Sequence, residues 1–268
     1  MKLLEFQERF STEEACVEYL VQVRWPQGYA CPACGGKEYW HKKERRTFDC
    51  KACRKQYSVT ADTMFHKTQT DLREWFWAIY LMCQSKKGIS TLELQRLLGA
   101  RDYRRVEHMQ NRIRQAMENR EGLYSLEGFV EVDEAFFGGK RSGGKRGRGS
   151  ENKTQVLVQA SVDSDRNLQY ARMTVLENSE GKTLRQTVKA TVKKGSTLYT
   201  DGNPSYDKLS EQGYAHIPRV MRFPEDCQQH LPWVHILIAN PKRFILGTHH
   251  SLHKLQPYLH EFCYRLTT

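Results

Sequence analysis

The sequence predicts an α/β protein in which a mixed β-sheet with flanking helices follows a small cysteine-rich module and a short helical segment. Paired cysteines occur within residues 1–60, apolar side chains recur at steps of three and four between 61 and 122, and short runs rich in Val, Phe and Leu follow within 123–268. Steps of three and four are typical of helices, and short β-branched and aromatic runs are typical of strands. We therefore expect domains at 1–60, 61–122 and 123–268.

The net charge predicts a polyanionic partner. The 42 Lys and Arg side chains outnumber the 31 Asp and Glu side chains, which leaves a formal charge of +11. Basic surfaces bind phosphate backbones by releasing counterions, so nucleic acid is the first candidate and an anionic membrane the second. No apolar run of about 18 residues occurs, and Glu5 and Glu8 come too early for the apolar segment of a signal peptide. We expect a cytoplasmic protein without a membrane partner.

Two cysteine pairs predict a zinc site. Cys31 and Cys34 form one Cys-x-x-Cys pair, and Cys50 and Cys53 form the other. This spacing lets two pairs of thiolates, each on a turn, converge on one tetrahedral Zn²⁺ ion. Four thiolates leave no open coordination position, so the zinc would be structural and the module a zinc ribbon. A redox pair or a chance spacing is the alternative.

The segment 61–122 predicts helices with recognisable ends. Asp71 can cap a first helix, Ser90 and Glu93 can form a capping box at the start of a second, and Gly99 can end it. A third helix follows. Two helices joined at a glycine, with a basic second member, are typical of a helix-turn-helix.

The basic side chains of the third helix are candidate DNA contacts. They include Arg104, Arg105 and Arg112. The alternative is a small helical bundle whose arginines only face solvent.

The C-terminal part predicts strands and one intervening helix. The expected strands are Phe129–Phe137, Gln155–Val162, Leu168–Leu176 and Ser196–Thr200, with a helix near 179–193. Strands followed by a helix and another strand predict a mixed sheet. A glycine-rich basic loop, 138–149, separates the first two strands, and its cations are predicted to contact DNA phosphates; a solvated, disordered loop is the alternative. These cations are Lys140, Arg141, Lys145, Arg146 and Arg148.

Two aspartates are candidate ligands of catalytic metal ions. Asp133 lies inside an apolar alternating strand, where an ionised carboxylate is costly unless it is paired or bound to metal. Alternation places Glu131 on the same face as Asp133. Asp201 ends a strand immediately before Gly202. Aspartates on adjacent strands can hold two divalent cations about 4 Å apart, and Mg²⁺ or Mn²⁺ suits their oxygens. A turn-forming role is the alternative for either residue.

Motifs along nearly the whole chain resemble those of the zinc-ribbon insertion-sequence transposases of the DDE class. Besides the cysteine pairs, the motifs are Arg24–Pro26, Gln56–Thr60, Lys87–Ser90, Val132–Glu134 with Phe137–Gly139, Tyr199–Gly202, and Lys242–Arg243 with Gly247–Thr248. The resemblance implies an RNase H-like catalytic domain and metal-dependent cleavage of the DNA at the ends of the element. It also implies strand transfer by a 3′-hydroxyl and at least a homodimer that holds two element ends.

The resemblance also implies a third metal-site residue on a late helix, two helical turns before a lysine. His235 and Lys242 occupy these positions, and no glutamate stands there. A neutral histidine can ligate a divalent ion, but it is softer than a carboxylate and suits magnesium less well. Asn240, with an amide oxygen, is the second choice, and a purely structural histidine is the alternative. Lys242 and Arg243 are expected to face phosphates.

These observations together predict a transposase. The ribbon and the helix-turn-helix would bind the inverted repeats in double-stranded DNA, and Asp133, Asp201 and His235 would hold the catalytic metals. Such a protein would be associated with the nucleoid of a prokaryote. The missing third carboxylate leaves a rival open, a non-catalytic or domesticated zinc-ribbon DNA-binding regulator.

Overall fold

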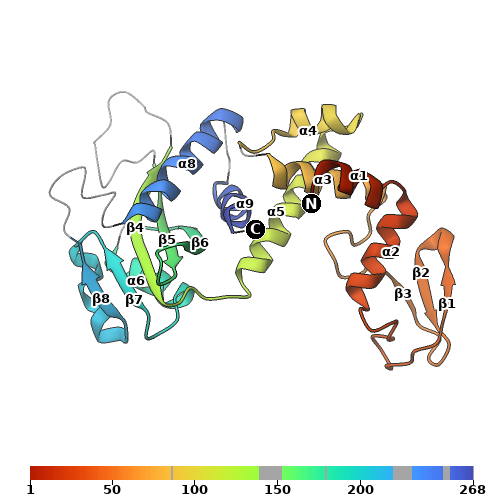
Figure 1. The fold of residues 1–268 in the computed structure, drawn as a ribbon, viewed down its shortest axis with the longest axis horizontal. Coiled ribbons are helices and arrows are strands. Elements are labelled where there is room, and N and C mark those ends of the chain that lie inside the picture. Colours follow the sequence, from red (N-terminus) through yellow and green to blue (C-terminus); the bar gives the residue numbers. More distant parts are fainter. Residues whose placement is uncertain (86, 139–152, 179, 220–230, 250–253, 268) are drawn as a thin grey trace. The chain divides into compact units, whose positions relative to one another are not determined.

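The computed structural model describes residues 1–85, 87–138, 153–178, 180–219, 231–249 and 254–267. Within it the chain forms two compact units, an N-terminal unit (Met1–Ile113) and a C-terminal unit (Arg114–Thr268) (Figure 1). No helix among the described residues is long and apolar enough to cross a membrane.

The N-terminal unit combines a small antiparallel sheet with helices. Its elements are α1 (Leu3–Arg9), α2 (Glu13–Arg24), β1 (Tyr39–Lys42), η1 (Lys43–Arg45), β2 (Thr47–Cys50), β3 (Gln56–Ser58), α3 (Leu72–Gln84), α4 (Thr91–Leu98) and the first part of α5 (Tyr103–Glu121). The strands form one antiparallel sheet in the order β1-β2-β3. Aromatic rings of α1 and α3 pack together, with Phe6 and Tyr80 stacked at 4.3 Å between centroids.

The ends of α3 and α4 confirm the predicted caps. The Asp71 side chain accepts the N–H of Arg73 at 2.7 Å, and Ser90 Oγ accepts the N–H of Glu93 at 3.1 Å. Gly99 ends α4 with a left-handed φ of 62°, a conformation that costs glycine little. Side-chain acceptors satisfy N–H groups that the first helical turn leaves without partners, which fixes where each helix begins.

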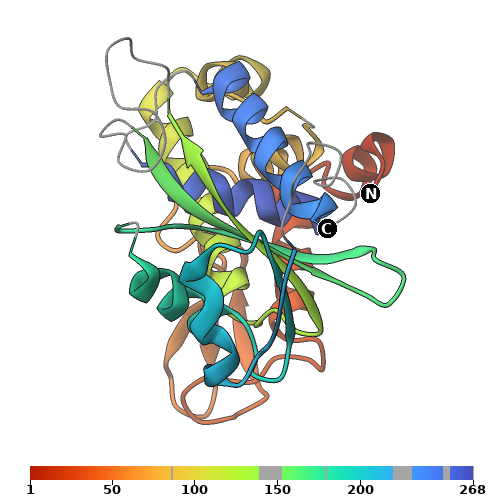
Figure 2. The same cartoon turned by 90° about the vertical axis from the view of Figure 1, so that its left-hand side faces the viewer.

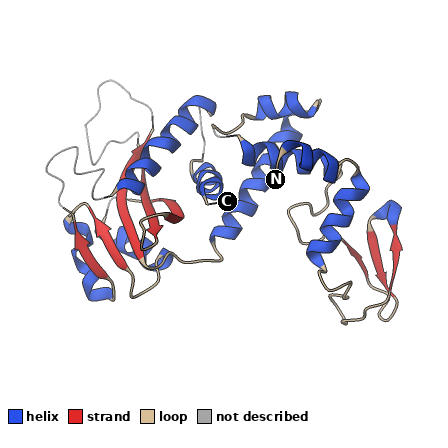
Figure 3. Cartoon of the chain, viewed as in Figure 1, coloured by secondary structure: helices blue, strands red, loops and turns tan. Residues whose placement is uncertain are grey.

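The C-terminal unit is built on a five-stranded mixed sheet (Figure 3). Its elements are the end of α5, β4 (Phe129–Phe137), β5 (Thr154–Val162), β6 (Leu168–Val175), α6 (Gly181–Thr191), β7 (Thr197–Thr200), η2 (Pro204–Gln212), β8 (Ala215–Pro218), α8 (Pro232–Thr248) and α9 (Gln256–Leu266). The strand order is β6-β5-β4-β7-β8. β4, β5 and β6 pair antiparallel, and β4, β7 and β8 pair parallel. This is the predicted RNase H-like mixed sheet.

Helices cover both faces of this sheet (Figure 2). On one face, α8 and α9 bury side chains of β4, β5 and β6 that include Ala135, Val158 and Met173. On the other face, α6 and η2 pack on side chains that include Val130 and Val132. Successive residues of a strand point to opposite faces, so β4 directs Glu131 and Asp133 to the side of α8. Glu131 and Asp133 therefore lie beneath the late helix, whereas Glu134 lies on the other face.

The predicted strands match the observed ones within about two residues, a normal uncertainty at element ends. The prediction omits β8, whose residues Ala215–Pro218 are mostly exposed. β8 is short, lacks alternation and ends in proline, so its sequence does not resemble a strand. Among the described strands it pairs with β7 alone, at the edge of the sheet.

Candidate functional site

The four predicted zinc ligands converge in the N-terminal unit. The Sγ atoms of Cys31, Cys34, Cys50 and Cys53 all lie within 4.8 Å of one another, and the Cys31–Cys53 and Cys34–Cys50 pairs are each 3.6 Å apart. A tetrahedral ion with Zn–S bonds of about 2.3 Å sets its sulfurs about 3.8 Å apart. The donor set therefore fits one zinc ion with no open coordination position.

The two cysteine pairs occupy equivalent turns. The residue after each pair, Gly35 or Arg54, has a left-handed φ of 72° or 62°. Its N–H donates to the carbonyl of the first cysteine of its pair, at 2.8 Å to Cys31 and 3.0 Å to Cys50. The repeated geometry directs both thiol pairs toward one point. A non-glycine residue in this conformation is unusual, and Arg54 also contacts the Trp40 ring at 4.9 Å.

In the C-terminal unit, strand register places the two predicted catalytic aspartates in one row. β4 and β7 pair in parallel, and the last pair is Glu131 with Tyr199. Continued by two residues, one beyond the end of β7 at Thr200, this register sets Asp133 beside Asp201, and the charge of Asp201 acts on the pKa of Asp133. Adjacent strands are about 4.8 Å apart. Continued by one residue, the β7–β8 register sets Arg219 on the other side of Asp201.

The surroundings of Asp133 make its negative charge costly. Burial raises the pKa of Asp133, the N–H of Glu134 lowers it, and the charges of Asp201 and Glu134 raise it again, to about 7. A divalent cation beside the two aspartates would relieve both the burial and the repulsion. The chemistry of these donors therefore fits a Mg²⁺ or Mn²⁺ ion.

Asn203 links the turn that contains Asp201 to Glu134, which lies on the opposite face of β4. The Asn203 N–H donates to the Asp201 carboxylate at 3.0 Å, and the Asn203 amide donates to Glu134 at 3.0 Å. Burial raises the pKa of Tyr206 well above its usual value, and the charges of Glu134, Asp133 and Asp201 add to this shift. Sequence reasoning missed Asn203 and Glu134, although each lies close to a predicted aspartate in the chain.

Glu131 links the acidic strand to helix α8. Its side chain is buried, with 6% of its surface exposed, and its carboxylate accepts the N–H groups of Trp233 and Val234 at 2.9 and 3.0 Å. Pro232 begins α8, so these are the first N–H groups that the helix offers. The strand that bears Asp133 therefore caps the helix that bears the predicted third metal-site residue.

The residues considered for the third metal position differ in their surroundings on α8. His235 is half-buried, its Nε2 atom is buried without a hydrogen-bond partner among the described residues, and burial lowers its pKa. Asn240 is exposed. Lys242 is half-buried, with Nζ 5.5 Å from the centre of the Phe137 ring on β4, and burial lowers its pKa. Among the described residues, no hydrogen bond or charge interaction joins His235 to Asp133 or Asp201.

Comparison with known families decides the class of this protein. Residues 125–267 match the family model of the ISXO2-like transposase domain, and residues 11–56 match that of the transposase zinc-ribbon domain. The chain belongs to the ISXO2-like transposase family. The aspartate row and the cysteine cluster thus lie within the transposase and zinc-ribbon matches, respectively.

Individual relatives of this transposase are distant. An uncharacterized protein in transposable element ISH50 of Halobacterium salinarum is 26% identical over 220 residues, which cover 75% of this chain and 71% of that protein. A Mos1 transposase paired-end complex with left transposon end is 14% identical, with a TM-score of 0.27 and coverage of 75% of this chain and 78% of that one. A pre-cleavage Mos1 transpososome is 12% identical, with a TM-score of 0.23 and coverage of 70% and 77%.

The arginines that the sequence proposes as DNA contacts of the transposase have different environments. Arg104 and Arg243 are exposed. Arg105 forms an ion pair with Glu74 at 2.9 Å, and Arg112 donates to the carbonyl of His66 at 3.0 Å. The predicted cations of the glycine-rich loop lie outside the described residues. These are Lys140, Arg141, Lys145, Arg146 and Arg148.

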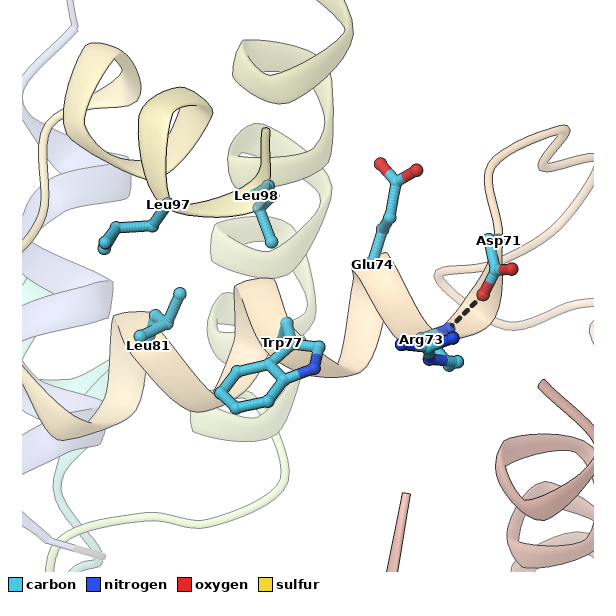
Figure 4. Close-up of a pocket in the computed structure, with 7 residues that line it drawn as sticks. All are labelled: Asp71, Arg73, Glu74, Trp77, Leu81, Leu97 and Leu98. Atoms are coloured by element: carbon cyan, nitrogen blue, oxygen red, sulfur yellow. Dashed lines mark hydrogen bonds between the residues drawn. The ribbon is translucent and has the colours of Figure 1, made fainter. Parts of the chain in front are cut away.

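A separate pocket of about 480 Å³ lies between α3 and α4 of the N-terminal unit (Figure 4). Leucines from the two helices form its apolar part, and charged residues at the start of α3 form its polar part. The lining residues are Asp71, Arg73, Glu74, Trp77, Leu81, Leu97 and Leu98. None of the residues predicted to bind metal or DNA lines this pocket.

Proposed function

We propose that this transposase cleaves the DNA at the ends of its element and joins the freed strand to target DNA, with divalent cations held by Asp133 and Asp201. The main support is the register of β4 and β7, whose continuation by two residues brings these aspartates side by side. Burial and the neighbouring charge of Asp201 raise the pKa of Asp133 to about 7, which a bound cation would reverse. Mg²⁺ and Mn²⁺ are the ions that carboxylate oxygens suit best.

Divalent ions at this row would polarise the phosphate and stabilise the attacking and leaving oxygens. Asp133 and Asp201 would hold them through carboxylate oxygens. In the proposed first step, water attacks the phosphodiester in line, which leaves a 5′-phosphate on one strand end and a 3′-hydroxyl on the other. In the second step, this 3′-hydroxyl attacks a target phosphodiester and releases the target's own 3′-hydroxyl.

His235 is our choice for the third metal position. Burial lowers the pKa of its imidazole, which favours the neutral form that a ligand needs, and its buried Nε2 has no other partner among the described residues. Asn240 is the second choice because its amide oxygen suits a hard cation. Lys242 and Arg243 would approach the phosphates of the DNA.

The ribbon and the helical segment that follows it are our candidates for recognition of the inverted repeats. A structural Zn²⁺ in the ribbon of residues 1–60 and the helices of residues 61–122 would position the basic side chains on double-stranded DNA, while residues 123–268 catalyse. The formal charge of +11 supports this partner. Two element ends would require a homodimer, and a prokaryotic nucleoid would be its place of action.

Cleavage of labelled element-end DNA with Mg²⁺ or Mn²⁺ tests the proposal. We expect Asp133→Ala and Asp201→Ala to reduce cleavage to background while duplex binding persists. His235→Ala should reduce cleavage more than Asn240→Ala does. Glu177→Ala, an exposed carboxylate outside the row, is the matched control. Cleavage that survives both aspartate substitutions would disprove the metal site. DNA binding without any cleavage by the unaltered protein would favour the non-catalytic regulator.

A further inference from the structure

A pocket of about 500 Å³ opens beside the aspartate row in the C-terminal unit. It lies where β4 begins, β5 ends and β7 reaches its last residues, on the face of the sheet that α8 covers. Its lining combines two aromatic rings with two arginines. The lining residues are Phe129, Glu131, Val162, Asp163, Ser164, Arg166, Tyr199 and Arg219. A volume of this size is in the usual range for small-molecule sites.

The aromatic wall of the pocket is partly exposed. The rings of Phe129 and Tyr199 lie 6.2 Å apart between centroids, at 32° to each other. Phe129 is 41% exposed and belongs to neither hydrophobic core of the unit. Tyr199 is half-buried and packs against the core of the unit, so the exposed ring of Phe129 is the main surface on which a planar base can stack.

The arginines of the pocket are available to an anion. The guanidinium of Arg219 lies 5.4 Å from the centre of the Tyr199 ring, and Arg166 approaches from the turn between β5 and β6. Among the described residues, no salt bridge joins either arginine to a carboxylate, although the charge of Arg166 acts on Glu131 and lowers its pKa. The two carboxylates of the lining already have N–H partners, because Glu131 caps α8 and Asp163 accepts the N–H groups of Asp165 and Asn167.

The turn that presents Arg166 is already organised. The Asp163 carboxylate accepts hydrogen bonds from Asp165, Asn167 and Gln169. The Arg166 carbonyl accepts the indole N–H of Trp233 on α8 at 2.7 Å, and its backbone has a left-handed φ of 62°. A preorganised site loses little entropy on binding.

The pocket adjoins the proposed catalytic row. Neither aspartate lines the pocket, but Tyr199 on β7 stands two residues before Asp201, about 7 Å along an extended chain. Arg219 follows β8, and its N–H donates to the Thr200 carbonyl at 2.7 Å, which sets it beside Asp201. A DNA strand whose phosphate lies at the aspartates would therefore bring its neighbouring nucleotide to the pocket.

We propose that this pocket binds an unpaired nucleotide adjacent to the cleaved bond. Its base stacks on Tyr199 and Phe129, and its phosphate contacts Arg166 and Arg219. This inference rests on the proposed function, because it names the form of DNA that the same site takes. A nucleotide drawn out of the duplex exposes the scissile phosphate to the aspartates, and the pocket offsets the cost of unstacking it.

Binding without cleavage tests the pocket directly. Fluorescence anisotropy of the full-length, zinc-loaded protein is measured without Mg²⁺ or Mn²⁺, on a blunt duplex and on the same duplex with a single-stranded 3′ tail. We expect tighter binding of the tailed duplex. Tyr199→Ala should weaken tailed binding roughly tenfold, since stacking contributes about 1–3 kcal/mol per base. Blunt-duplex binding should stay at the wild-type level.

Further variants separate stacking from folding. Tyr199→Phe should keep the preference for the tailed duplex, and Phe129→Leu, at an exposed position, should reduce it. Arg166→Ala should lower the salt dependence of tailed-duplex binding by about one counterion. Tyr170→Ala removes an exposed tyrosine outside the pocket and is the matched control. An equal affinity of the wild type for both duplexes, or a preference that Tyr199→Ala and Phe129→Leu both leave intact, would overturn the proposal.

The outcomes for the pocket and for the proposed function are distinguishable. A Tyr199-dependent tail preference in a protein that never cleaves DNA would keep the pocket and reject the metal-dependent chemistry. Cleavage that depends on Asp133, in a protein without any tail preference, would do the reverse.

Discussion

The carboxylate of Glu131 accepts the backbone N–H of Val234 at 3.0 Å, and with it the N–H of Trp233 at 2.9 Å. Burial raises the pKa of Glu131, while these two N–H groups lower it. β4 thus supplies both the proposed metal ligand Asp133 and the cap that sets the start of α8. This contact and the core packing of Val234 and Leu237 together position α8, which bears His235, on β4.

Removal of the cap should loosen α8. Glu131→Ala leaves two N–H groups without their acceptor, and a buried group left unsatisfied costs about 1–3 kcal/mol. We expect faster hydrogen exchange in the first turns of α8 and a lower unfolding temperature. Glu131→Gln keeps an acceptor oxygen and should have a smaller effect. Glu127→Ala, an exposed carboxylate paired with Lys193, is the control, and equal exchange in all variants would contradict the prediction.

The stability of the metal-free protein should fall as the pH rises toward neutrality. The folded pKa of Asp133 is about 7, against an ordinary value of 3.8. Between these values the folded state keeps a proton that the unfolded state has released, so stability decreases with rising pH by up to about 4 kcal/mol. Calorimetric unfolding in chelator at pH values below and above this window measures the loss.

Asp133→Asn provides the comparison for this pH effect. The amide does not titrate, so the variant should unfold at a higher temperature than the wild type above pH 7 and nearly the same temperature at low pH. Addition of Mn²⁺ should stabilise only the wild type, because only its carboxylate binds the ion. A pH profile identical in both proteins would show that Asp133 does not titrate near 7.

Loss of zinc should unfold the ribbon. Structural zinc supplies most of the folding free energy of small Cys-rich modules. We expect Cys34→Ser to abolish stoichiometric zinc in elemental analysis and to remove the near-ultraviolet circular dichroism of the ring cluster around Phe48, which Trp25 and Tyr29 contact at 5.0 and 5.7 Å. Cys83→Ala, outside the cluster, should retain full zinc. Zinc retained by Cys34→Ser would reject the four-cysteine site.

A buried ion pair should make α9 sensitive to single substitutions. Arg114 Nε and Glu261 Oε2 are 2.7 Å apart, with 2% and 0% of their side chains exposed. Glu261→Gln removes the buried negative charge that Arg114 and Arg265 share, the latter at 3.6 Å, and should lower stability by about 3–5 kcal/mol in urea unfolding. Arg114→Met combined with Glu261→Leu should lose less. Lys193→Ala, at an exposed pair, should leave the urea midpoint close to that of the wild type.

The accuracy of the sequence predictions follows the burial of each segment. The strand Phe129–Phe137 is predicted at its observed bounds because its alternating apolar residues face two cores. The exposed strand β8 has no such pattern and is absent from the prediction. Helix caps at Asp71 and Ser90 are predicted because the capping residue and its partner are close in the chain.

Contacts between distant segments cannot be predicted in the same way. Arg114 looks like one more cation of a basic helix until α9 brings Glu261 against it. The cap that Glu131 gives to α8 depends on a contact across the unit, which one strand's sequence does not show. Asp133 and Asp201 are different, because the place of one inside a strand and of the other directly after a strand can be inferred from pattern alone. Their roles in binding metal stay a prediction.

The parallel pairing of β4 with β7 limits how this gene can change length. Because side chains alternate between faces, one inserted codon between Thr197 and Asp201 would turn the second aspartate toward α6 and away from its partner. Point substitutions in the same stretch would leave that alignment intact. Insertions or deletions of single codons in this stretch should therefore be selected against far more strongly than base substitutions.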